Sequence, residues 1–249
     1  MLKYFLSPPN WFTSASIFCG FYAILLAASN PNDPAVFYQA GLLIGFAGIF
    51  DMLDGRVARM TRTESEFGVQ LDSLADVVSF GVAPAVLVYR WGLDSLGIVG
   101  LAAAFFFVLC GVFRLACFNT GAADHEEFEH SRGLTITMAG GTVAAMVMFH
   151  AAIGSTFVQN PIGPLFTVVA LALLMVSSVP YPTTKALRMS RKVKTAAALF
   201  LGTVVAVGVF YDISFVVLPI MVLYAAAGPI SAANGVRRRV RARRRPDRD

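Results

Sequence analysis

Long apolar runs separated by short polar connections form the dominant pattern of this chain. A helix needs roughly 20 mainly apolar residues to cross the hydrocarbon core of a bilayer, and these runs have about that length. The connections carry proline, glycine, asparagine or aspartate, which favour turns and helix ends. The pattern therefore predicts eight membrane-spanning helices, at residues 11–29, 35–59, 69–90, 95–118, 133–153, 162–180, 194–211 and 214–234.

The composition favours an all-α fold. The chain is 57% hydrophobic and only 14% charged, which excludes an ordinary soluble domain. The sequence lacks the alternating segments of an outer-membrane barrel, so a polytopic membrane helical bundle is the expected architecture. We expect one membrane domain over residues 1–236, followed by a basic cytoplasmic tail at residues 237–249.

The distribution of basic residues predicts how the bundle is oriented. With eight spans, all of the 20 lysines and arginines except Arg90 fall on the side of the two termini. Because cytoplasmic connections are enriched in basic residues, we expect both termini on the cytoplasmic side of the inner cell membrane. The arginine-rich tail is then expected to contact anionic membrane lipid, and nucleic acid is not an expected partner.

Four aspartates interrupt the apolar pattern around the connection between the second and third spans. Asp51 and Asp54 lie one helical turn apart before this connection, and Asp72 and Asp76 lie one turn apart after it. If the two helices pack as an antiparallel pair, the four carboxylates converge near the cytoplasmic face. A charge at the centre of a membrane helix costs roughly 2.5–3.5 kcal/mol, so a cationic partner is expected among the acids. A pair of divalent ions, Mg²⁺ or Mn²⁺, suits carboxylate ligands.

Small residues and one arginine accompany the acids. Gly55, Ala58 and Gly68 leave room for a nucleotide or pyrophosphate to approach the backbone closely. Arg59 can pair with a phosphate through its planar guanidinium group. Two divalent ions about 3.5–4 Å apart can clamp a phosphate during in-line displacement. A carboxylate that is not fully engaged by metal can accept the proton of an attacking hydroxyl.

Together these residues resemble the signature of the CDP-alcohol phosphatidyltransferase family. The pattern D-x-x-D-G-x-x-A-R, eight further residues and then G-x-x-x-D-x-x-x-D is filled at every fixed position. The resemblance implies a CDP-linked lipid as donor, CMP as the leaving group, two divalent ions held by the acids, the last aspartate as catalytic base, and a homodimer. The positions that match are Asp51, Asp54, Gly55, Ala58, Arg59, Gly68, Asp72 and Asp76, of which Asp54 to Asp72 are expected to bind the CDP-lipid.

Further segments are similar to the phosphatidylserine synthase branch of this family. This similarity implies CDP-diacylglycerol as donor, L-serine as acceptor and phosphatidylserine as product. One segment departs from the branch: RGLTITMAGG (132–141) stands where a GLPxPxA-like stretch is usual, so the start of the fifth span is expected to differ in shape. The similar segments are PNWFT (9–13), FCGFYAI (18–24), LDSLADVVSFGVAPA (71–85), RLACFN (114–119) and VSSVPYPTTK (176–185).

The acceptor site is expected near the cytoplasmic ends of later spans. Arg114 and Asn119 are candidates to hold serine or phosphate, and Arg132 and Lys185 are further candidates. Two alternatives keep the CDP-lipid chemistry: another acceptor (glycerol phosphate, inositol phosphate or choline) or an archaeal ether lipid as donor. A divalent-cation transporter is a third hypothesis. It would place acids at the membrane midplane and carry an inverted repeat, and the sequence has neither feature.

The remaining residues with reactive or polar groups are expected to be structural. Cys19, Cys110 and Cys117 lie in apolar runs and are predicted to be buried packing residues. The segment DHEEFEH (124–130) is predicted to be a solvated connection rather than a metal site, because its histidines lack a helical spacing. Gly140 is predicted to be a helix-packing contact.

Overall fold

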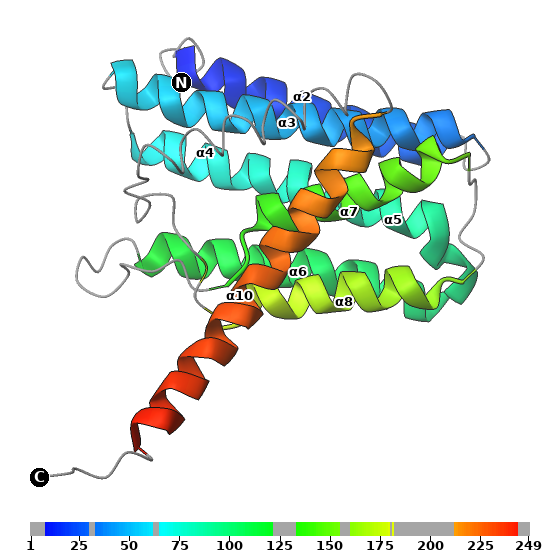
Figure 1. The fold of residues 1–249 in the computed structure, drawn as a ribbon. Coiled ribbons are helices and arrows are strands. Elements are labelled where there is room, and N and C mark those ends of the chain that lie inside the picture. Colours follow the sequence, from blue (N-terminus) through cyan, green and yellow to red (C-terminus); the bar gives the residue numbers. More distant parts are fainter. Residues whose placement is uncertain are drawn as a thin grey trace, which may run out of the picture.

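A computed structural model describes residues 8–29, 33–61, 65–121, 133–154, 160–179, 181 and 212–243, with side chains as far as residue 232. Every regular element in these ranges is a helix, as expected for an all-α bundle (Figure 1). The helices are α2 (Pro8–Ser29), α3 (Pro34–Thr61), α4 (Glu66–Asp76), η1 (Val77–Val82), α5 (Ala83–Val88), η2 (Tyr89–Leu93), η3 (Asp94–Leu96), α6 (Ile98–Gly121), α7 (Ile136–Ala152), α8 (Ile162–Val176) and α10 (Ser214–Arg243).

Seven of the eight expected spans correspond to apolar helices in the described ranges. Five helical stretches are long and apolar enough to cross a membrane: 8–29, 34–61, 66–96, 98–120 and 214–232. The fifth and sixth expected spans are shorter than predicted, because Thr135 caps α7 at its start and α8 ends before Ser177. The expected span at 194–211 lies outside the described residues, so the count of eight stays a prediction.

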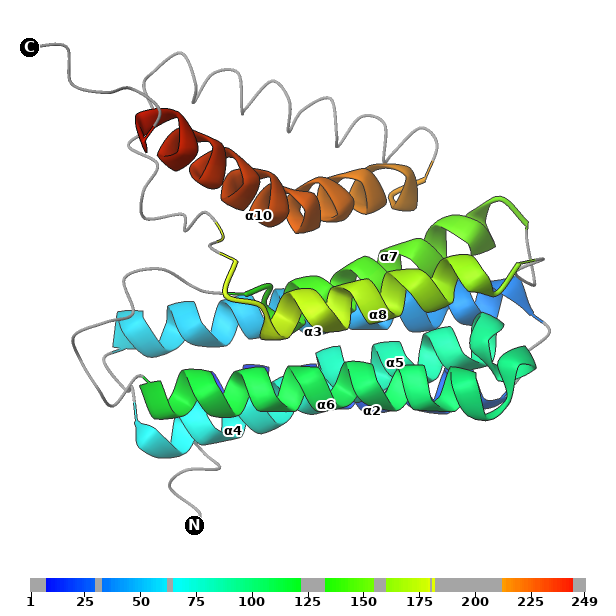
Figure 2. The ribbon, with the colours of Figure 1, turned by 90° about the horizontal axis from the view of Figure 1, so that it is seen from below.

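Most of the long helices pack against at least one other long helix. The most extensive contacts join α2 with α3, α3 with α7, α6 with α8, and α7 with α10. In Figure 2, α10 lies on the outer side of α7 and α8, while α4 and α6 lie on the other side of them. The buried interior is made of apolar side chains, with Trp91, Phe37, Phe80 and Phe107 the largest that are fully buried.

Glycines allow close approach where helices cross. A Cβ atom added at Gly20 would lie 2.7 Å from the Cα atom of Ser79, so a side chain there would separate α2 from η1. A Cβ atom at Gly140 would overlap the Phe80 carbonyl, and the prediction that Gly140 is a packing contact is confirmed. Ser79 also donates a hydrogen bond to the Ser16 carbonyl at 3.0 Å.

The third span is one helical stretch that changes its winding directly after Asp76. Over Val77–Val82 it forms a wider π turn, in which the Ala83 N–H donates to the Val78 carbonyl five residues back. Pro84 follows and has no N–H to donate, which disfavours the regular α-helical ladder at this point. The wider turn alters the direction of the side chains that follow, and such turns are frequent at functional sites.

The prediction for the cysteines is correct in part. Cys19 and Cys110 are buried, but Cys117 is exposed. Cys117 lies near the end of α6 and is exposed although Leu115 in the same turn of the helix is buried, so an apolar sequence environment does not ensure burial there.

A proline in α10 is compensated from outside the helix. Pro229 has no N–H, so it cannot donate to the carbonyl of Ala225 four residues earlier. Tyr181 supplies the missing donor: its hydroxyl, which is buried, donates to the Ala225 carbonyl at 3.0 Å. The backbone of α10 continues as helix into the basic segment, as far as Arg243.

Candidate active site

Three carboxylates converge where α3 faces α4. Asp51 lies in the second half of α3, and Asp72 and Asp76 lie one turn apart in α4. One carboxylate oxygen from each of the three lies within 4.8 Å of the others. The expected convergence of acids from the two sides of the connection is therefore present for these three residues, and we refer to them as the acid cluster.

The local sequence places α4 so that its acids face α3. Only residues 62–64 separate the end of α3 from Ser65, and α4 runs in the opposite direction to α3 and packs mainly against α2 (Figure 1). Ser65 starts α4 as its N-cap, with its hydroxyl accepting from the Gly68 N–H at 3.1 Å. Asp72 and Asp76 then share one face of the helix because they are four residues apart.

Asp54 lies beside the acid cluster but differs from its members in environment. It is 6% exposed, whereas the three clustered aspartates are only partly buried. Its carboxylate accepts a hydrogen bond from the Thr13 hydroxyl of α2 at 2.8 Å. It also interacts electrostatically with Asp51 and Asp72. Sequence analysis predicted a role for Asp54 but none for Thr13.

The acid cluster carries more negative charge than the neighbouring described side chains neutralise. Two like charges 4 Å apart repel by about 4 kcal/mol at an effective dielectric constant of 20. Arg114, half-buried on α6, interacts electrostatically with Asp76 and supplies one positive charge. An all-carboxylate oxygen set suits a hard divalent cation such as Mg²⁺ or Mn²⁺, so the residues present fit the metal that the sequence predicts.

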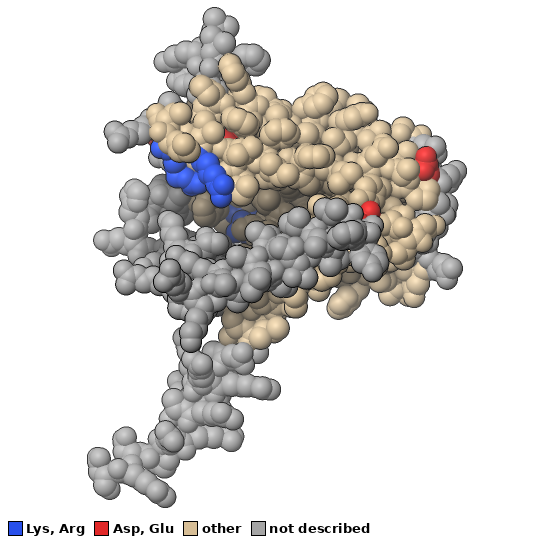
Figure 3. Space-filling view, turned by 45° about the horizontal axis from the view of Figure 1, so that its top comes forward, with Lys and Arg blue, Asp and Glu red and all other residues tan. Residues whose placement is uncertain are grey.

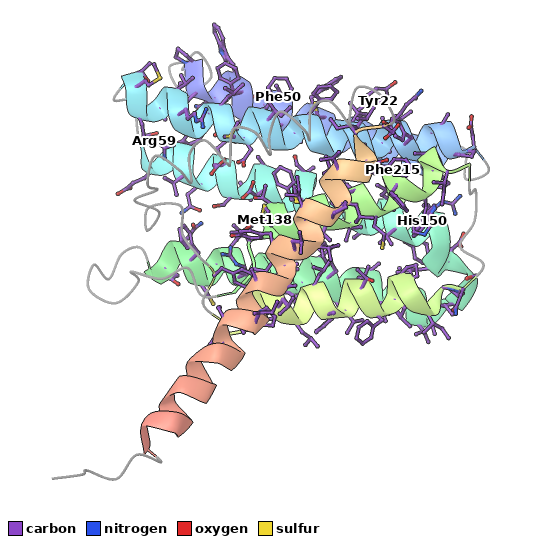
Figure 4. All side chains as sticks on the ribbon, viewed as in Figure 1. Tyr22, Phe50, Arg59, Met138, His150 and Phe215 are labelled. Carbon is purple, nitrogen blue, oxygen red and sulfur yellow. The ribbon has the colours of Figure 1, made fainter. Side chains whose placement is uncertain are left out.

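The small residues near the acids leave space beside the backbone. A Cβ atom added at Gly55 would meet only the Arg59 guanidinium, at 4.0 Å, so no other described helix packs against this glycine. A Cβ atom at Gly68 would meet the Ser65 hydroxyl at 3.3 Å. Ala58 is half-buried and Arg59 is exposed. Figure 4 shows Arg59 at this end of α3, close to α4 and far from His150.

Two of the four candidate acceptor residues lie next to the acid cluster. Arg114 faces Asp76, and the Asn119 side-chain amide donates to the Ser73 hydroxyl at 3.0 Å. Ser73 follows Asp72 directly, so this bond connects α6 to the part of α4 that carries the acids. Sequence reasoning missed Ser73, although it lies within LDSLAD (71–76). Arg132 and Lys185 lie outside the described residues.

The opposite end of the bundle has a different character. Figure 3 shows basic side chains at the end where α3 meets α4, and a patch of acidic side chains at the far end. A cavity of about 480 Å³ lies at that far end, and no predicted site residue contributes to it. Its walls are formed by Asp33, Pro34, Ala35, Tyr38, Gln39, Ala151, Ala152 and Asp212.

Comparison with known proteins is consistent with this geometry. A CDP-diacylglycerol–serine O-phosphatidyltransferase of Helicobacter pylori (strain J99) is 37% identical over 202 residues, which are 79% of this chain and 80% of that protein. The protein of the same name from Bacillus subtilis is 32% identical over 175 residues, 70% of this chain and 89% of its own length. An archaetidylserine synthase of Methanothermobacter thermautotrophicus is 33% identical over 180 residues, 72% of this chain and 70% of its own. Residues 6–230 match the family model of CDP-alcohol phosphatidyltransferases, and the chain belongs to that family.

Proposed function

We propose that this protein transfers the phosphatidyl group of CDP-diacylglycerol to the hydroxyl of L-serine, giving phosphatidylserine and CMP. The observation that carries the proposal is the acid cluster of α3 and α4, in a chain whose relatives include serine phosphatidyltransferases. Carboxylates gathered at one end of a membrane bundle suit chemistry on a lipid headgroup.

The acids are the proposed metal ligands. Asp51, Asp54, Asp72 and Asp76 would hold two divalent ions, Mg²⁺ or Mn²⁺. When bound, these ions would offset the negative charge of the pyrophosphate and of the departing CMP. The partly exposed carboxylates of the acid cluster remain accessible to a ligand, and Asp54 joins them from a buried position.

Asp76 is the proposed catalytic base. The serine oxygen attacks the lipid-side phosphorus, a new P–O bond forms, and the bond from that phosphorus to the CMP oxygen breaks. The hydroxyl proton passes to the Asp76 carboxylate. Arg114 interacts electrostatically with Asp76 and partly offsets the negative charge of its carboxylate.

The CDP-lipid is proposed to lie along the face of α3 and α4 that carries the small residues. Gly55 has no other described helix against it, which leaves space for a phosphate or ribose. The small side chains of Ala58 and Gly68 leave space on the neighbouring surface. Arg59 is exposed, and its long side chain can reach a phosphate bound there. Asp54 and Asp72 border the same surface.

The acceptor is proposed to bind between α4 and α6. L-serine carries a carboxylate and an ammonium group, so its site needs a cation for the carboxylate and both hydrogen-bond donors and hydrogen-bond acceptors. Arg114 supplies the cation, and Asn119 with Ser73 supplies amide and hydroxyl groups next to Asp72. Arg132 and Lys185 are proposed as additional contacts on the strength of the sequence alone.

The cellular setting is also a proposal. Described basic side chains gather at the end of the bundle that carries the acid cluster (Figure 3), which supports a site facing the cytoplasm from the inner cell membrane. Family resemblance supports a homodimer. A second candidate function uses a different lipid donor, because one relative is an archaetidylserine synthase.

An acceptor screen tests the proposal. Purified protein in detergent is given CDP-diacylglycerol with L-serine, and CMP release is measured with and without EDTA. We expect serine-dependent CMP release that EDTA abolishes. Release with glycerol phosphate, inositol phosphate or choline in place of serine would contradict the proposed acceptor, and release only with a CDP-linked ether lipid would contradict the proposed donor.

A further inference from the structure

We propose that Thr13 is a positioning residue that holds the Asp54 carboxylate in the orientation needed to bind the divalent cation. The inference rests on the proposed function and adds to it a residue from α2, a helix that carries none of the predicted site residues. Thr13 does not touch the reacting atoms, and its effect passes through Asp54.

The contact joins two buried groups from different helices. Thr13 is 4% exposed and Asp54 is 6% exposed, and 41 residues separate them along the chain. Their helices, α2 and α3, pack against each other more extensively than any other pair of described elements. A hydrogen bond in such a place is shielded from water and is held by the packing on both sides.

The hydroxyl proton of Thr13 has two possible acceptors, and geometry favours the carboxylate. The Asp54 Oδ2 atom lies 2.8 Å from the hydroxyl oxygen, whereas the Pro9 carbonyl lies 3.3 Å away. A hydrogen bond to an ionised acceptor is also roughly twice as strong as one between neutral groups. The hydroxyl has one proton, so it is directed at Asp54.

The carboxylate of Asp54 keeps room for a cation despite this bond. An ionised carboxylate has about four lone-pair positions, and the Thr13 hydroxyl occupies one of them. A buried donor fixed on a neighbouring helix restricts the rotation of the carboxylate about its side-chain bonds. The remaining lone pairs therefore keep one direction, beside Asp51 and Asp72, with which Asp54 interacts electrostatically.

Removing the hydroxyl should weaken metal binding more than turnover. Partners that orient metal ligands typically change metal affinity or activity by about 10- to 100-fold when they are mutated. For Thr13→Val, which keeps the side-chain shape, we expect the dissociation constant for Mn²⁺ to rise by about 10- to 100-fold. Thr13→Ser restores the hydroxyl and should restore affinity. Turnover at saturating Mn²⁺ should fall much less than affinity.

The experiment measures Mn²⁺ binding to the purified full chain by electron paramagnetic resonance, without substrate. Thr142→Val is the matched control, because Thr142 is also a buried threonine, but its hydroxyl donates to the Met138 carbonyl within α7 at 2.7 Å. Thr13→Ala serves as a second variant that lacks the hydroxyl, and unfolding in EDTA checks that each variant is folded.

The outcomes separate the inference from the proposed function. Wild-type Mn²⁺ affinity in folded Thr13→Val or Thr13→Ala would overturn the inference, and so would an equal loss in Thr142→Val. Absence of Mn²⁺ binding in the wild-type chain would overturn it as well. If Thr13 controls Mn²⁺ affinity but serine releases no CMP, the inference stands and the proposed acceptor fails.

Discussion

The two ends of the helical bundle both carry aspartates, but their carboxylates have different partners. At the end away from the acid cluster, Asp94 forms an ion pair with Arg90 at 3.9 Å, and Asp212 accepts from the Tyr38 hydroxyl at 3.0 Å. Asp33 accepts from the Ala35 N–H at 2.9 Å. Each of these acids has a donor of its own.

At the other end, the carboxylates face one another. Oxygens of Asp51, Asp72 and Asp76 lie within 4.8 Å of each other, an arrangement that is unfavourable for ionised groups without a cation. The comparison shows that the number of acids at a membrane surface is a weak indicator of function. What distinguishes a candidate metal site is that the carboxylates of different helices share one small volume.

The largest expected effect comes from removing the proposed base. Asp76→Asn should lower kcat by about 10²- to 10⁴-fold, the usual contribution of general acid–base catalysis, because the amide cannot accept the serine proton. CDP-lipid binding should be largely retained. The control at the other end is Asp212→Asn, which alters the contact with Tyr38 and should leave CMP release near the wild-type rate. Normal turnover of Asp76→Asn would remove this residue from the role of base.

The second effect concerns stability with metal. A ligand present at 100 times its dissociation constant stabilises the folded state by about 2.7 kcal/mol, so saturating Mg²⁺ should raise the Tm of the wild-type protein. Asp51→Asn should lose most of this increase because one member of the acid cluster is neutralised. Asp33→Asn at the other end should keep it. An equal Tm increase in the wild type and in Asp51→Asn, measured by thermal unfolding in detergent, would argue against metal binding at the cluster.

The smallest effect is expected at the acceptor side. Ser73→Ala removes the hydroxyl that accepts from Asn119, and a hydrogen bond of this kind contributes about 0.5–1.5 kcal/mol. The KM for serine should therefore rise by about 2- to 12-fold, with a small change in kcat. Ser95→Ala is the control, since Ser95 donates only to the Gly92 carbonyl at the far end. Steady-state kinetics at varied L-serine concentration measure the KM of each variant. An equal KM in Ser73→Ala and Ser95→Ala would contradict a role of Ser73 in acceptor binding.

The convergence of the acids could be predicted from sequence because it depends on local rules. Helical spacing puts Asp72 and Asp76 on one face, and the short connection after α3 keeps the start of α4 near the end of α3. The apolar spans follow from hydropathy in the same way. Arg114 was predicted as an acceptor residue with the help of related sequences, but its position near Asp76 could not be predicted, because no spacing connects α6 with α4.

Contacts between distant helices could not be predicted. Thr13 is one of several small polar residues near the start of its span, with Asn10, Ser14 and Ser16, and nothing in its spacing points to Asp54 in another helix. The bond between Asn119 and Ser73 likewise depends on how α6 packs against α4. For Cys117 the sequence predicted burial, but the side chain is exposed. Hydropathy is averaged over a window of residues, so it does not tell which face of a helix packs against a neighbour.

The hydrogen bond from Tyr181 to the Ala225 carbonyl also restricts how α10 can move. If α10 slid by one turn along its neighbours, that carbonyl would lose its external donor, and Pro229 could not replace it. A bare carbonyl in hydrocarbon costs several kcal/mol, so alternative sliding positions of this helix are disfavoured. Because Pro229 lacks an N–H, the hydrogen bond from Tyr181 determines how α10 is aligned along its neighbours.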